Sequence, residues 1–162
     1  MKYLRVFCAA VLAVCTTAAL ARTPDAVLYN GLIYPEMGTI ANAMKARGQN
    51  VVVLWHDAPV SICAKYFLGH SMGGIAALNQ AARCAALGNP PKAVVVIDPT
   101  GYPGTLTCPK RVACLDYYDP THLIGGGARA VAGAANVRMS GYSHIQLPSV
   151  AKVVRGALAA TQ

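Results

Sequence analysis

The sequence predicts an α/β protein, a three-layer sandwich whose central sheet of about five to six strands is mostly parallel. Short apolar runs alternate with segments of helical period along most of the chain. Two of these runs, 51–55 and 93–97, are too continuously apolar for a sheet that has one exposed face. Short loops join the successive elements, as in a parallel sheet that helices cover on both sides.

Each expected element has its own signal in the sequence. In the first helical segment, Met37, Ile40, Ala41 and Met44 follow the helical period, and Gly48 is suited to end it. The expected strands are 26–30, 51–55, 66–68 and 93–97, with weaker ones at 111–118 and 136–139, and the expected helices are 37–48, 72–88 and 148–160.

The first 21 residues have the pattern of a secretory signal peptide. Lys2 and Arg5 form a charged start, residues 6–20 are almost wholly apolar or small, and Ala-Leu-Ala at 19–21 fits a cleavage site. The apolar stretch is short for a transmembrane helix, and Val14 is bulky for a residue that precedes a lipidated cysteine. We therefore expect a signal peptide over 1–21, a single domain over 22–162, and a protein that is secreted or periplasmic.

The net charge of +8 comes from basic residues that are scattered along the chain. A nucleic-acid groove needs such residues in a cluster, so nucleic acid is not an expected partner. The charge is compatible with a weak attraction to anionic surfaces, and equally with simple solubility. The chain is expected to be a monomer.

Four cysteines follow the predicted signal peptide, and export would allow them to form disulfides. Cys63 lies eight residues before Ser71, at the base of the expected strand 66–68, and Cys84 lies 13 residues after it on an expected helix. Eight strand steps descend about 26 Å and 13 helical steps about 20 Å, so both thiols reach the bottom of the sheet. We therefore predict the pair Cys63–Cys84 and a small local loop closed by Cys108–Cys114. None of the spacings matches a zinc site.

Residues 69–73 read Gly-His-Ser-Met-Gly, a G-x-S-x-G sequence between an expected strand and an expected helix. A serine hydroxyl acts as a nucleophile when a sharp strand-to-helix turn holds it rigid and exposed next to a base. The glycines suit the close approach of the two elements, and the backbone N–H of Met72 at the helix start would face a developing oxyanion. The alternative reading is a glycine-rich turn around a buried serine.

The carboxyl ends of parallel strands meet at one edge of the sheet, where ligand sites of such folds lie. Applied here, the rule brings to one edge Ser71, the loop at 30–31, Asp98, Asp119 and the loop that carries His144. This convergence depends on the topology alone and is independent of the serine motif.

With these features the chain resembles the α/β-hydrolase family, and is most similar to its small lid-less members such as minimal bacterial lipases and cutinases. The family's order of serine, acid and histidine implies that Ser71 is the nucleophile and His144 the base. The acid is implied to be Asp98, in the Asp-Pro-Thr sequence at 98–100, with Asp119 as the alternative and Asp116 less suited because it lies within a strand. The first strands of full-size family members are missing.

The resemblance also implies an oxyanion hole made by the backbone N–H groups of Leu32 and Met72. Asn30 stands where the family often has a histidine, which is a departure from its pattern. Of the other histidines, His70 is expected to pack in the core and His122 to be exposed in a loop, while His56 could line the rim of the site.

The resulting interpretation is an exported serine hydrolase that cleaves carboxylic esters or thioesters through an acyl-enzyme, without a cofactor or a metal. Its site would be open, which suits short-chain esters or the surface of a polymeric ester. The alternative is a catalytically inactive secreted binding protein that keeps the fold.

Overall fold

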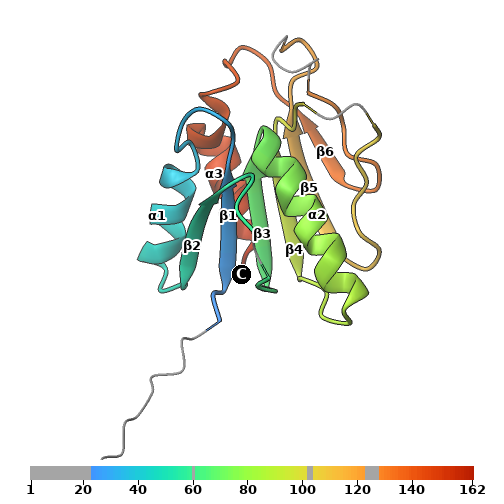
Figure 1. The fold of residues 1–162 in the computed structure, drawn as a ribbon. Helices are drawn as coiled ribbons and strands as arrows, with labels where there is room; N and C mark the ends of the chain where they lie inside the picture. The colour runs from blue at the N-terminus through green and yellow to red at the C-terminus, as the bar shows by residue number, and fades with distance from the viewer. Residues whose placement is uncertain (1–22, 60, 102–103, 123–127) are drawn as a thin grey trace, which may run out of the picture.

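The computed structural model describes residues 23–59, 61–101, 104–122 and 128–162 (Figure 1). The predicted signal peptide over 1–21 lies outside these residues, so its assignment remains a prediction. Among the described residues, no helix is long and apolar enough to cross a membrane.

Within the described residues, six strands form one wholly parallel sheet in the order β2-β1-β3-β4-β5-β6, which confirms the predicted fold class. The expected elements are all present, with small differences at their ends. The last helical segment is divided into a 3-10 turn and a helix, and the fifth strand begins two residues later than expected. The elements are β1 (Ala26–Asn30), α1 (Gly38–Ala46), β2 (Val51–Trp55), β3 (Tyr66–His70), α2 (Met72–Ala86), β4 (Ala93–Ile97), β5 (Ala113–Tyr118), β6 (Ala135–Arg138), η2 (Leu147–Ser149) and α3 (Ala151–Ala160).

Helices cover both faces of the sheet and make the three layers (Figure 1). Helix α2 packs on one face against β1, β3 and β4, while α1 and α3 pack against each other on the opposite side. Because side chains alternate along a strand, each strand contributes to both cores. Phe67 and Val94 join the cluster under α2, and Leu68 and Val95 join the cluster under α1 and α3.

The direction of strand addition reverses next to β1. The chain passes from β1 outward to β2, then crosses to β3 on the other side of β1 and continues outward to β6. In open α/β sheets, ligands bind at the carboxyl ends of the strands beside such a reversal. The loops that follow β1 and β3 therefore meet at the position where a site is expected.

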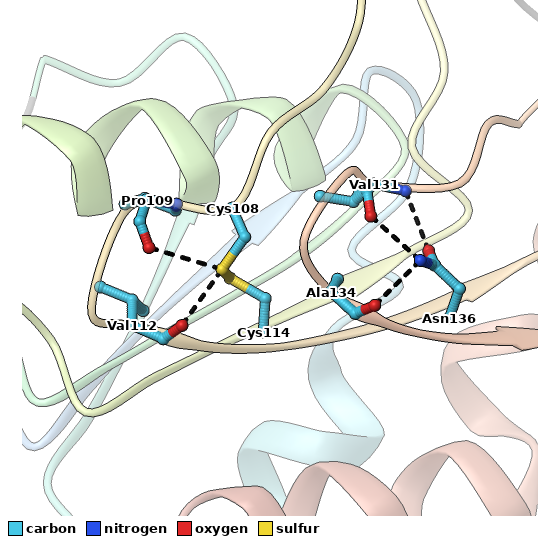
Figure 2. Close-up of a disulfide and its surroundings, with 7 residues drawn as sticks. All are labelled: Cys108, Pro109, Val112, Cys114, Val131, Ala134 and Asn136. Carbon is cyan, nitrogen blue, oxygen red and sulfur yellow. Dashed lines mark hydrogen bonds between the residues drawn. A yellow bond between two sulfur atoms is a disulfide. The ribbon is translucent and has the colours of Figure 1, made fainter.

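The part of the chain that the structure describes has two disulfides, in the pairing that the sequence predicts. Cys63, three residues before β3, is joined to Cys84 on α2, and the Cα–Cα distance is 5.6 Å. Cys108 is joined to Cys114 on β5 with a Cα–Cα distance of 6.0 Å. Figure 2 shows this second disulfide beside a turn at residues 131–136. The side chain of Asn136 holds this turn through hydrogen bonds with backbone groups of Val131 and Ala134.

Candidate active site

Ser71 occupies a strained turn between β3 and α2. Its φ of 57° and ψ of −128° fall in a region that residues with a side chain rarely adopt, at a cost of about 1–3 kcal/mol. Two backbone hydrogen bonds hold the turn: Ser71 N–H donates to the Ile97 carbonyl at 2.9 Å, and Gly74 N–H donates to the Ser71 carbonyl at 3.0 Å. The serine is thus fixed at the carboxyl end of β3 in the strand-to-helix turn that the sequence predicts, but it is only 7% exposed, whereas an exposed hydroxyl was expected.

The two glycines of the motif are required by close backbone contacts. A Cβ on Gly69 would lie 2.0 Å from the Gly73 carbonyl oxygen, and a Cβ on Gly73 would lie 2.3 Å from the Tyr29 carbonyl oxygen. Neither contact can be relieved by moving a side chain, since both are with backbone atoms. The first turn of α2 therefore lies directly against β1 and β3.

His144 and Asp98 form a buried hydrogen-bonded pair at the same edge. The Nδ1 of His144 lies 2.6 Å from Oδ2 of Asp98, whose side chain is fully buried, and the backbone N–H of Asp119 donates to its Oδ1 at 2.9 Å. Burial alone raises the pKa of Asp98, but the hydrogen bonds from His144, Asp119 and His122 outweigh it and hold this pKa below its usual value. Asp98 therefore stays ionised and fixes the ring of His144.

The carboxylate of Asp119, the alternative acid, is engaged elsewhere. Its Oδ1 accepts hydrogen bonds from the backbone N–H of Thr121 at 2.9 Å and from the Thr121 hydroxyl at 2.7 Å. These two bonds hold the pKa of Asp119 below its usual value. The geometry favours Asp98 as the partner of His144, while Asp119 caps its own loop and supports Asp98 through its backbone N–H.

The hydroxyl of Ser71 lies 2.9 Å from the hydroxyl of Thr100. Among the described residues, the Ser71 hydroxyl has this hydrogen bond to Thr100 and none to the ring of His144. Ser71 and His144 nevertheless line the same cavity. Thr100 is not among the site residues that the sequence predicts. Its place two residues after Asp98, in a loop at the carboxyl edge of the sheet, is the signal that could have identified it.

His122 is not the exposed loop residue that the sequence analysis expected. Its side chain is only 13% exposed, its Nδ1 contacts Oδ2 of Asp98, and its Nε2 lies 2.7 Å from the Tyr142 carbonyl oxygen. Burial alone lowers the pKa of His122, but the bond to Tyr142 and the bond and charge of Asp98, with a contribution from Asp119, leave it raised. Two histidine rings therefore face one carboxylate oxygen.

The two other histidines support the loops around the site. His70 is fully buried, as expected for a core residue: its Nε2 lies 2.9 Å from the His144 carbonyl oxygen and the two ring centroids are 4.4 Å apart. The Nδ1 of His56 lies 3.2 Å from the carbonyl oxygen of Gly31. Both rings thus contact the backbone of loops that border the cavity.

The loop after β1 carries Leu32, the expected oxyanion donor. Asn30, which departs from the family pattern, has a structural role here: its Oδ1 accepts a hydrogen bond from the backbone N–H of Met37 at 3.1 Å and closes the loop. Glu36 Oε2 accepts a weaker bond from Gly31 N–H at 3.4 Å. Leu32 and Met72 both line the cavity together with Ser71, so the residues predicted to supply backbone donors border the nucleophile.

The cavity has a volume of about 240 Å³ and is largely apolar. Several residues that line the cavity are also exposed to solvent: Leu32 is 63% exposed, and Ile33, Tyr34 and Ile145 are exposed to a similar extent. The serine and the histidine both line this largely apolar depression, which leaves room for a small apolar group beside them. The residues of its walls are Leu32, Ile33, Tyr34, Glu36, Met72, Thr100, Gly101 and Ile145.

The ligand atoms of Asp98, His122 and His144 lie within 4.8 Å of one another, so their chemistry could also suit a metal ion. The distances argue for hydrogen bonds instead. Ligands about 2.0–2.1 Å from a tetrahedral ion lie roughly 3.3 Å apart, whereas His144 Nδ1 and Asp98 Oδ2 are 2.6 Å apart. A proton fits between these atoms and a metal ion does not.

Solved structures share the architecture of this chain. A protein from Xanthomonas campestris pv. campestris assigned to the alpha/beta superfamily of hydrolases superposes with a TM-score of 0.51 at 11% identity, over 85% of this chain and 94% of that chain. The RedJ thioesterase from the prodiginine biosynthetic pathway in Streptomyces coelicolor gives a TM-score of 0.48 at 12% identity, over 89% of each chain. No protein-family model and no curated protein matches the sequence. At these identities the likeness concerns the fold, and the chain has the fold of the α/β-hydrolase superfamily in a minimal form with six parallel strands.

Proposed function

We propose that this protein is a serine hydrolase that cleaves carboxylic esters or thioesters through an acyl-enzyme. The observation that carries the proposal is the pair of His144 and Asp98, which lies beside a strained serine that lines the same cavity. A serine, an oriented imidazole and a buried carboxylate at one site are the parts that acyl transfer needs.

In the proposed mechanism, Asp98 accepts the Nδ1–H of His144, so that the lone pair of Nε2 is available as a base. The Ser71 hydroxyl turns from Thr100 toward Nε2, gives up its proton and attacks the carbonyl carbon of the substrate. The backbone N–H groups of Leu32 and Met72 would stabilise the oxyanion. His144 then protonates the leaving group, and a water activated by the same ring hydrolyses the acyl-enzyme.

The walls of the cavity support an apolar acyl group as the substrate portion next to Ser71. The volume of about 240 Å³ suits a short acyl chain, and the exposed wall residues leave the site open to a larger alcohol portion or a polymer surface. Export to an oxidising compartment is part of the proposal, and the two disulfides support it.

The test is turnover of a short-chain p-nitrophenyl ester by the full chain, with and without Ser71→Ala. We expect the substitution to lower kcat/KM by at least about 10³-fold, since the nucleophile is lost. Ser149→Ala is the matched control: its hydroxyl is exposed and bonds the Gln146 carbonyl, so the control should keep its turnover. Equal turnover by the Ser71→Ala variant would exclude the proposed mechanism.

A second candidate is a non-catalytic binding protein that uses the same cavity. The hydrogen bond between Ser71 and Thr100 favours it, because a serine bound to Thr100 is not yet paired with the base. A fluorophosphonate probe distinguishes the two candidates: an activated Ser71 becomes labelled and loses labelling in Ser71→Ala, whereas the serine of a binding protein remains unlabelled.

A further inference from the structure

His122 has hydrogen-bond acceptors at both of its ring nitrogens. Its Nδ1 contacts the carboxylate of Asp98, and its Nε2 lies 2.7 Å from the carbonyl oxygen of Tyr142. A carbonyl oxygen accepts but does not donate, so Nε2 must carry a proton. An ionised carboxylate also only accepts, so Nδ1 must carry a proton as well.

We propose that His122 is held as an imidazolium cation in the folded protein and acts as a positioning residue that weakens the basicity of His144. The inference rests on the proposed function for its catalytic consequence, but the charge of His122 follows from its contacts alone. An Asp–His pair with a neutral base carries a charge of −1. With His122 protonated, the three groups Asp98, His122 and His144 carry a net charge of zero.

The surroundings of His122 favour the cation. Among the described residues, the carboxylates of Asp98 and Asp119 act on His122 through their charges, and the ring of His144 has its centroid 5.9 Å away. The His144 ring is neutral when it serves as a base. A basic side chain, Arg138, acts on Asp119. The residues that follow His122 in the sequence, 123–127, are Leu-Ile-Gly-Gly-Gly and carry no ionisable side chain.

The same contacts join two separate loops. His122 belongs to the loop after β5, whereas Tyr142 and His144 belong to the loop that follows β6. A protonated His122 therefore links the acid to the loop of the base while it adds a positive charge next to both. When His144 takes the proton of Ser71, a second cation must form beside the first, and this repulsion makes His144 the weaker base.

The experiment is a pH titration of the histidine rings by ¹H–¹⁵N NMR in the full chain, compared with His122→Gln, which removes the charge. For the unmodified protein we expect both nitrogens of His122 to be protonated at neutral pH. In His122→Gln, the titration of His144 should move to higher pH, because a positive charge whose ring centroid lies 5.9 Å away is removed. The acid limb of kcat/KM should move to higher pH by the same amount.

His122→Lys, which restores a positive charge, should return the titration of His144 toward its original position. His56→Gln is the matched control, because its ring contacts the Gly31 carbonyl, and it should leave that titration unchanged. If His122 only fastened the two loops, Gln and Lys would lower kcat equally without moving the pKa of His144, and the proposal would be wrong. A neutral His122 ring at neutral pH in the unmodified protein would also overturn it.

The NMR readout does not depend on turnover. If Ser71→Ala kept full activity, the proposed hydrolase mechanism would fail while the titration still decided the charge of His122. If the ester assays succeeded and His144 titrated identically in all variants, only the role of His122 would be lost.

Discussion

Asp98 and Asp116 are two fully buried carboxyl groups on neighbouring parts of the sheet, yet their charges differ. Asp98 follows β4 directly, and Asp116 lies within β5 opposite Val96. Asp98 has two histidine rings and a backbone N–H as partners. The Oδ2 of Asp116 accepts one N–H, from Val131 at 3.2 Å, and its Oδ1 has no hydrogen-bond partner among the described residues.

The pKa values follow the number of donors. Burial is the main cause that raises the pKa of Asp116, the N–H of Val131 opposes it in part, and the negative charge of Asp98 adds to it, so that the pKa is about 7. The side chain of Asn136 also accepts from the same Val131 N–H at 2.9 Å, so Asp116 shares its donor. Of two carboxyl groups that are both fully buried, the one to which loops bring donors is therefore ionised, and the one inside a strand is about half protonated at neutral pH.

The largest expected effect distinguishes the two acids by activity. Asp98→Asn should lower kcat/KM by about 10³–10⁴-fold, because an amide cannot hold His144 in the required tautomer or stabilise its cation. Asp116→Asn makes the same chemical change one strand away and should stay within a few-fold of the unmodified protein. Steady-state ester hydrolysis measures both. A comparable loss in the two variants would mean that their different environments do not decide function.

The second expected effect is on stability and its pH dependence. Between about pH 4 and 7, Asp116 holds a proton in the folded protein, because its pKa is raised there, whereas the same group has lost its proton in the unfolded chain. Asp116 therefore destabilises the fold increasingly as the pH rises through this range. Asp116→Asn should remove this slope and, relative to the unmodified protein, gain up to about 4 kcal/mol from pH 4 to 8.

Urea unfolding at pH 5 and pH 8 measures this difference. Asp57→Asn, at an exposed aspartate, is the matched control and should leave the slope unchanged. A slope that persists in Asp116→Asn would assign it to another group. Asp98 has the opposite sign: its lowered pKa contributes stability at neutral pH, which is lost as pH falls through the folded-state pKa.

The smallest expected effect concerns Asp119, the alternative acid. Asp119→Asn should reduce kcat/KM by less than about tenfold, because the bond that Asp119 gives to Asp98 comes from its backbone N–H and survives the substitution. The amide oxygen of the new Asn can still accept both bonds from Thr121, now without the negative charge, so the thermal midpoint should fall only slightly. A loss as large as that of Asp98→Asn, measured in the same assay, would make Asp119 the functional acid.

The sequence was sufficient for those features that depend on period and order. Apolar runs predict the six strands, the Cys63–Cys84 pairing follows from chain rises measured from Ser71, and the Cys108–Cys114 pairing follows from the short spacing between the two residues. The same order places Asp98 and His144 at the edge where the structure pairs them. These predictions need only the local periodicity and the rule that parallel strands end together.

Contacts between loops could not be predicted in this way. His122 reads as exposed because nothing in its neighbourhood indicates that the loop after β5 reaches Tyr142. Thr100 and the closing role of Asn30 are hidden for the same reason, since each depends on how an irregular segment folds back on itself or on a neighbouring loop. Pro148 was assigned to the last helix, whereas it lies in the 3-10 turn before it.

The tight contacts at Gly69 and Gly73 have a consequence for related sequences. Backbone oxygens would collide with any side chain at these two positions, whether or not the protein turns over a substrate. A homologue without catalytic activity would still need both glycines to fold. Only the hydroxyl of Ser71, the imidazole of His144 and the carboxylate of Asp98 could then be replaced without harm to this packing. The presence of both glycines in a homologue therefore indicates that this packing is kept, and does not indicate activity. Activity must be judged from the three side chains.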